Sequence, residues 1–346
     1  MIYNPPMSSA AFLEIPLVRA LLRTLLFTTI LEAIFYRLLT LPPGLSSAWT
    51  GDVQTSTSRA GLLMFLIGFA LLVPAILSIA YAALRAPAWP HAMNPIVSIG
   101  LLAAAALGIS AAFGPRGPLF ALGFALLSAF VSLLMLASLY ETRADLAGRL
   151  FAILLGAHVV ASALAGAAEL ANQLAPFRAP FPPIAMAAAA RWLFILAGLA
   201  AFPAFAPGAA ISGRPLERAA SFGFSAASAF TLILGAVVRP ASLSRIAAAP
   251  GVGPALSLPV VLRTTAAAAA LFLTVLTACR CFARPETRLT AYGLAFVLLS
   301  GHPHRVAYEH LLAVCGLALL SATAAPKPLM LPLTMLPGEP TPAPNA

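Results

Sequence analysis

PLFALGFALLSAFVSLLMLASL, residues 118–139, is a stretch without a single charged side chain. It is long enough to cross a bilayer as a helix, which takes about 20 apolar residues. Apolar runs of similar length recur from about residue 17 to residue 325, and the connections between them are short and rich in proline, glycine and arginine. The pattern predicts an all-α fold, a polytopic integral membrane helix bundle with about nine or ten transmembrane helices and short loops.

The composition indicates the same fold class and limits the kinds of binding partner that we expect. Hydrophobic residues make up 61% of the chain and charged residues 9%, whereas soluble domains carry about 25% charged residues. The net charge is +10, but the arginines are spread over many loops instead of clustering in one patch. Nucleic-acid binders gather their basic side chains on one surface. We therefore expect the lipid bilayer as a partner, and no nucleic acid.

The predicted spans form a single transmembrane domain over residues 1–325. A polar loop is expected at 42–59. The run at 289–301 is short for a span, which predicts a tilted helix, a half-helix or one arm of a hairpin. Residues 326–346 form a proline-rich C-terminal tail whose composition cannot bury enough apolar surface to order itself. The expected spans are 24–41, 61–84, 95–113, 118–139, 150–170, 184–206, 219–238 and 260–279, with one or two more in 289–301 and 306–325.

Two features predict where the protein resides. Every basic residue except Lys327 is arginine and alanine is abundant, a usage typical of membrane proteins from GC-rich bacteria, so we expect a bacterial inner (plasma) membrane. Arginines are also more frequent in the loops that would share a side with the N-terminus. Because basic residues concentrate in cytoplasmic loops, both termini are expected in the cytoplasm.

Polar residues inside the spans are the candidates for chemistry. Glu32 lies near the middle of the first span, where a carboxylate costs about 2.5–3.5 kcal/mol on insertion scales unless it faces protein or a cavity. His158, Ser162, Ala165 and Glu169 recur at helical spacing in the span 150–170 and share one face. Glu32, His158 and Glu169 are therefore candidates for an ion or proton relay.

The same patterns also have a packing interpretation. Small side chains on one helix face allow a second helix to approach closely. The predicted helix-contact residues are Ser162, Ala165 and Gly166 in one span and Ser221, Ser225 and Ser228 in another. In that case the buried histidine and carboxylates would lock neighbouring helices together by hydrogen bonds.

We expect no metal and no cofactor. Cys279 and Cys281 have a C-x-C spacing without the four ligands of a structural zinc site. Haem, with His158 or His310 as an axial ligand, remains an alternative, because haem iron is commonly held by histidine.

No motif in the sequence identifies a catalytic site, and three hypotheses about the function remain. The leading hypothesis is a non-catalytic integral membrane subunit of a larger bacterial complex, with other integral membrane proteins as partners. The alternative is a secondary transporter or channel that uses Glu32, His158 and Glu169. The third is an intramembrane enzyme acting on a lipid or lipid-linked substrate, with Asp52 as its acid or base; because Asp52 has no second carboxylate beside it, an enzyme is the least favoured.

Overall fold

The computed structural model describes most of the predicted spans. The described residues are 16–39, 51–85, 94–113, 118–143, 145–174, 183–205, 273–274, 276–278, 280–282, 284, 287–301 and 308–323. The predicted span 219–238, most of 260–279 and the tail 326–346 lie outside them, and with them Ser221, Ser225 and Ser228.

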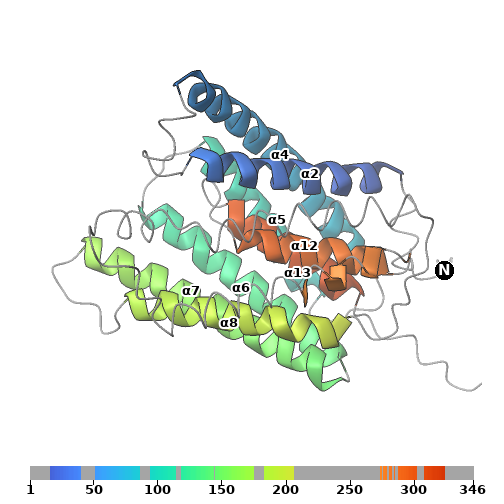
Figure 1. The fold of residues 1–346 in the computed structure, drawn as a ribbon. Coiled ribbons are helices and arrows are strands. Elements are labelled where there is room, and N and C mark those ends of the chain that lie inside the picture. Colours follow the sequence, from blue (N-terminus) through green and yellow to red (C-terminus); the bar gives the residue numbers. More distant parts are fainter. Residues whose placement is uncertain are drawn as a thin grey trace, which may run out of the picture.

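Every element among the described residues is a helix, and no strand occurs there (Figure 1). Four helices contain segments long and apolar enough to cross a membrane, at Arg59–Tyr81, Leu119–Thr142, Leu146–Ala171 and Ala185–Phe205. The all-α prediction is confirmed, and the fold is consistent with a helical membrane protein; the number of nine or ten spans remains a prediction. The helices are α2 (Pro16–Leu39), α4 (Gly51–Arg85), α5 (Asn94–Phe113), α6 (Pro118–Thr142), α7 (Leu146–Leu174), α8 (Pro183–Phe205), α12 (Arg288–Ser300) and α13 (Tyr308–Thr323).

One boundary differs clearly from the sequence prediction. The polar segment 42–59 was expected as a loop, but α4 already begins at Gly51 and includes Asp52. The serines, threonines and glutamine of this segment do not break a helix. The polar start of α4 therefore extends a membrane-type helix without being part of its apolar run.

The helices pack as a chain of neighbours around a central hairpin. Each helix from α2 to α8 packs against the next one in sequence, and α12 packs against α13. In Figure 1 the α12–α13 hairpin lies between the α2–α4 pair and the α6–α7–α8 group, and α13 contacts α4, α5 and α6. Of the alternatives for 289–301, one arm of a hairpin is what the structure contains.

The two helices of the hairpin approach each other through glycines. A Cβ built on Gly316 would lie 2.8 Å from the carbonyl oxygen of Gly293, and a Cβ on Gly293 would lie 2.9 Å from the carbonyl oxygen of Gly316. Every residue from Leu289 to Leu299 is buried. The shortest helices are thus the most enclosed, because protein and not lipid surrounds them.

Replacing Gly316 by alanine tests this contact. The added methyl has to push backbone atoms apart, so we expect a loss of stability of about 1–3 kcal/mol, the usual range for overpacking. Gly156→Ala is the control, since its nearest neighbour would be 3.7 Å away and alanine favours helix. The measurement is the thermal transition of the detergent-solubilised protein. Equal transitions for the two variants would show that the hairpin contact is looser than described.

Candidate functional site

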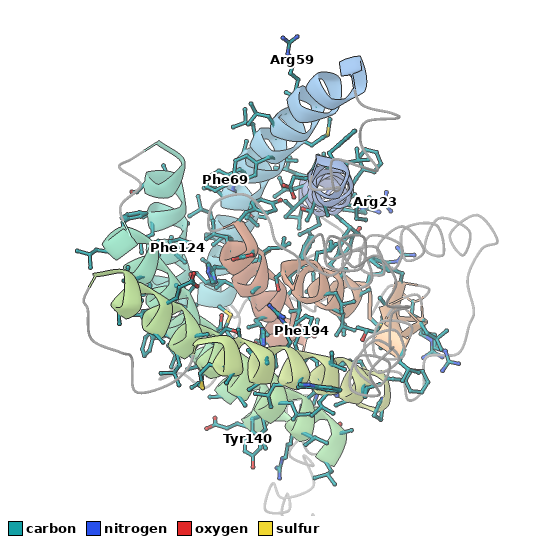
Figure 2. The ribbon with its side chains drawn as sticks, turned by 60° about the vertical axis from the view of Figure 1, so that its left-hand side comes forward. Arg23, Arg59, Phe69, Phe124, Tyr140 and Phe194 are labelled. Carbon is teal, nitrogen blue, oxygen red and sulfur yellow. The ribbon has the colours of Figure 1, made fainter. Side chains whose placement is uncertain are left out.

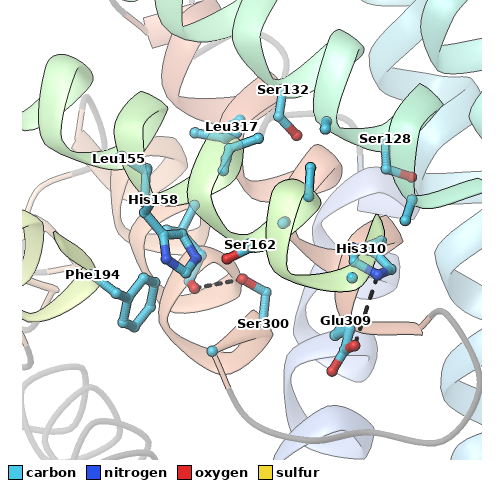
Figure 3. A pocket seen from close by; sticks show the side chains of 18 of the residues that line it. Ser128, Ser132, Leu155, His158, Ser162, Phe194, Ser300, Glu309, His310 and Leu317 are labelled. Atoms are coloured by element: carbon cyan, nitrogen blue, oxygen red, sulfur yellow. Dashed lines mark hydrogen bonds and ion pairs between the residues drawn. The ribbon is translucent and has the colours of Figure 1, made fainter. Parts of the chain in front are cut away.

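A cavity of about 550 Å³ lies between α6, α7, α8, α12 and α13 (Figure 3). Its walls are mostly alanine, leucine and valine, with polar side chains contributed by four helices. These are Ser128 and Ser132 of α6, His158, Ser162 and Glu169 of α7, Ser300 of α12, and Glu309 and His310 of α13. Polar groups from far apart in the sequence therefore meet in one place within a bundle of apolar helices.

The polar face predicted on α7 forms one wall of this cavity. His158, Ser162, Gly166 and Glu169 all line it, as their helical spacing predicts. Ala165 is half-buried on the same helix. A Cβ on Gly166 would meet no atom within 4 Å, so the small residues of this face border open space. Whether a partner helix also uses this face remains a prediction.

His158 is the best-positioned polar group of the site. Its Nδ1 lies 2.8 Å from the carbonyl oxygen of Ala190, and its ring lies 4.9 Å from that of Phe194, centroid to centroid. A carbonyl can only accept, so Nδ1 carries the hydrogen in this contact, and in the neutral ring Nε2 is the acceptor. The α8 backbone thereby orients the imidazole and leaves Nε2 to act as base or hydrogen-bond acceptor.

The opposite wall carries a second histidine. In the first turn of α13, His310 Nε2 lies 3.8 Å from Glu309 Oε1, and each side chain is close to two-fifths exposed. The His310 ring also packs at a tilt against Phe124 of α6, with 5.9 Å between the ring centroids. At 3.8 Å the pair is an ion pair only when the imidazole is protonated, and it is too long for a strong hydrogen bond. Both groups remain available to a solute or ion.

Glu32 is not part of the cavity. Its side chain is only 1% exposed on α2, and the residues around the cavity come from other helices. Of the three relay candidates, His158 and Glu169 therefore line the same cavity, and Glu32 lies elsewhere. Its burial satisfies the requirement that an intramembrane carboxylate avoid lipid.

Several lining residues were not identified from the sequence. Ser128 and Ser132 are four residues apart in the charge-free span 118–139, the spacing that marked the α7 face. Ser300 and Glu309 come from helices whose position in the bundle the sequence did not reveal. Asp52, the proposed acid or base of an enzyme, lies in α4, and its side chain is outside the described part of the structure.

Several residues of the structure bear on whether the protein could hold haem or a metal ion. His158 and His310 line the same cavity, so both possible haem ligands border one space. Among the described residues, no three histidine, cysteine, aspartate or glutamate side chains gather as a metal site would require. Cys281 and Cys315 are buried free thiols. The expectation of no cofactor remains a prediction.

A cysteine scan tests whether the cavity holds water. We expect Ser162→Cys to react with a charged, membrane-impermeant methanethiosulfonate several-fold faster than Val160→Cys, because Val160 is 42% exposed on the outer surface of α7 and does not line the cavity. The three native cysteines are replaced by alanine first. The measurement is the modification rate in reconstituted liposomes. Equal rates at the two positions would mean that the cavity is closed to water.

Comparison of the chain with known protein families, with curated proteins and with solved structures finds no match. The geometry and chemistry of the cavity are therefore the basis of the functional proposal.

Proposed function

We propose that this chain is a membrane transport protein, a secondary transporter or channel, whose solute or ion passes through the cavity between α6, α7, α8, α12 and α13. The observation that carries the proposal is His158. Its Nδ1 is held by the Ala190 carbonyl at 2.8 Å, and the ring borders a space that also contains Glu169 and His310.

Two physical arguments support transport over packing alone. Ionisable side chains inside membrane helices are costly and usually face a water-filled cavity or a substrate path. A volume of about 550 Å³ falls in the range of small-molecule sites, about 300–1,000 Å³. A purely structural polar contact would need a hydrogen-bond partner but no space beside it. Here the polar groups of four helices face a shared space.

The distribution of arginines supports an orientation. Arg143 stacks on Phe205 at 4.5 Å and Arg280 on Phe202 at 5.4 Å, so the end of α6, the end of α8 and the segment before α12 meet at one end of the bundle. The arginines at this end are Arg19, Arg23, Arg143, Arg149, Arg280, Arg284 and Arg288. By the preference of basic residues for the cytoplasmic side, this end, which includes the start of α2, faces the cytoplasm.

The cavity reaches the opposite end. Glu169 lies near the end of α7, Gly301 follows α12 and Glu309 lies at the start of α13. Arg59 projects at the same end of the bundle from the first turns of α4 (Figure 2). In the proposed orientation the cavity thus extends from the level of His158 toward the outer side, so a solute enters from outside. A bacterial inner membrane, as the composition suggests, places that side in the periplasm.

Flux through reconstituted liposomes tests the proposal. Liposomes carrying a pH-sensitive dye are challenged with a panel of organic acids, amines and inorganic cations, alongside protein-free liposomes. For the transported class we expect His158→Ala to lower flux by about tenfold or more, the effect of losing a strong hydrogen bond of about 1.5 kcal/mol. Val160→Ala, on the outer surface of the same helix, leaves it unchanged. If no member of the panel moves faster than in protein-free liposomes, the transport proposal is rejected.

A second candidate function is a subunit of a larger membrane complex. The observation in its favour is Gly123 of α6, which is exposed and whose Cβ would meet no atom within 4 Å. A glycine on an outer helix surface permits close approach of another helix. This candidate does not exclude transport, since a transporter can also assemble with other integral membrane proteins.

A bulky residue at position 123 tests whether another membrane protein packs on α6. Gly123→Leu should release any partner that packs on α6, because the side chain prevents close approach, while the isolated chain keeps its stability. Ala106→Leu on the exposed face of α5 is the matched control. The measurement is native mass in a mild detergent. A wild-type chain that runs alone at 35.6 kDa would reject the subunit function.

A further inference from the structure

The charged side chains that line the cavity indicate which kind of solute it would take. Among the described residues the lining includes Glu169 of α7 and Glu309 of α13, and no arginine or lysine. The chain as a whole has 20 basic and 10 acidic residues. Arg191 of α8 is exposed and does not line the cavity. Apart from its two histidines, the described lining is therefore acidic in a basic protein.

Both carboxyl groups can be reached by a solute. Glu169 is exposed near the end of α7, and the Glu309 side chain is 39% exposed. Glu309 lies in the first turn of α13, so it places a carboxylate at the end of the helix that would otherwise favour an anion. A cleft lined by acidic groups raises the local concentration of cations and repels anions.

Two further polar atoms in the cavity wall are suited to accept a hydrogen bond. The hydrogen on His158 Nδ1 is used at the Ala190 carbonyl, so Nε2 of the neutral ring accepts. Ser128 is only 2% exposed, and its Oγ is buried without a hydrogen-bond partner. A buried hydroxyl without a partner is uncommon and costs free energy. Ser128 is therefore a polar group that a bound solute could satisfy.

These atoms match the hydrogen-bonding needs of an ammonium group. An ammonium has three N–H donors and no acceptor, whereas a carboxylate solute has only acceptors. The cavity supplies carboxylate oxygens, an imidazole nitrogen and hydroxyl groups. For a carboxylate solute the described lining lacks the guanidinium or ammonium donor that commonly binds one. The chemistry of the lining thus favours a cation.

The size and the walls of the cavity favour an organic cation over a metal ion. No three potential metal ligands gather among the described residues, and a volume of about 550 Å³ leaves room for a carbon skeleton. Phe194 is held on the wall by the His158 ring at 4.9 Å and by Gly301, where a Cβ would lie 2.6 Å from Phe194 Cε1. Apolar walls can hold a carbon skeleton, and an aromatic ring attracts a cation.

We propose that the cavity binds an organic cation, a protonated amine on an apolar carbon skeleton, with its ammonium group at the acidic end formed by Glu169 and Glu309. The carbon skeleton lies against Phe194 and the aliphatic walls (Figure 3). Alkyl amines resemble the lysine side chain, whose pKa is about 10.4, so they are cations at neutral pH. This proposal rests on the transport function proposed above and names its class of solute.

The test measures how well a solute protects a cysteine in the cavity. The reporter is Ser162→Cys in the full chain in liposomes, with the three native cysteines replaced by alanine. The probe is methyl methanethiosulfonate, a neutral reagent that the carboxylates do not attract. Cyclohexylamine, cyclohexanol and cyclohexanecarboxylic acid are compared at pH 7, because they share one ring and differ in charge. We expect the amine to slow modification several-fold, and the alcohol and the acid to have little effect.

Two controls belong to this comparison. Val160→Cys on the outer surface of α7 reports any effect of the compounds on the bilayer, and none of the three should slow its modification. The acid is included because Arg305 lies in the connection 302–307, outside the described residues. Protection by the acid or the alcohol that equals or exceeds protection by the amine overturns the proposal. This comparison needs no carboxyl variant.

Carboxyl variants locate the ammonium group. Glu169→Gln and Glu309→Gln should each raise the amine concentration for half protection about tenfold, the effect of losing a hydrogen bond to a charged group. Glu141→Gln, exposed at the end of α6 and outside the cavity, should leave it unchanged. Each variant is compared with its own rate without amine, and its folding is checked by the thermal transition. Undiminished protection in the folded Glu169→Gln, Glu309→Gln double variant overturns the proposal.

The two proposals fail in distinguishable ways. If the amine protects Ser162→Cys through the carboxylates but no solute of the panel moves, the amine site is supported and transport is rejected. If an organic acid or an inorganic cation moves in a His158-dependent way while amines neither move nor protect, transport stands and the amine site is rejected.

Discussion

The close approach of α12 and α13 is the contact on which the rest of the structure depends. Because Gly293 and Gly316 have no Cβ, the backbones of α12 and α13 lie in direct contact. The hairpin is therefore narrow enough to lie inside the bundle. From there α13 reaches α4, α5 and α6. The first turn of α13 carries both Tyr308, whose hydroxyl lies 2.8 Å from Thr29 Oγ1 of α2, and His310, which lines the cavity.

Polar side chains occur in two different environments inside the bundle. Thr28, Thr29, Glu32 and Tyr308 are all buried, and the Tyr308 hydroxyl lies 2.8 Å from Thr29 Oγ1. The cavity is spacious, and its histidine is oriented by a backbone carbonyl instead of a second charge.

Most of the described arginines lie at the end of the bundle opposite to the cavity. Arginines at one end stack on aromatic rings of α8, as Arg143 does on Phe205 at 4.5 Å. This spares them from full exposure and orders the helix ends at the proposed cytoplasmic face. The cavity approaches the other end, where Glu169 and Glu309 supply carboxylates. Arginines at one end and a cavity near the other are what we expect of a membrane protein whose arginine-rich end faces the cytoplasm and whose cavity opens to the outer side.

The sequence by itself determined the helical class and the polar face of α7. Apolar length predicts helices because a helix satisfies its backbone hydrogen bonds within one segment, as lipid requires. A spacing of three and four residues puts His158, Ser162 and Glu169 on one side. These are local properties, set by 1.5 Å rise and 3.6 residues per turn.

Only the tertiary structure decided which faces meet. The run 289–301 is too short to be recognised as a central element, yet α12 is the most enclosed helix because glycines allow α13 to approach it. The contact between Thr29 and Tyr308 spans 279 residues of sequence, and His158 and His310 line one cavity from different helices. Such pairings depend on the shapes of packed surfaces, and the period of a single helix carries no information about the surface that will face it.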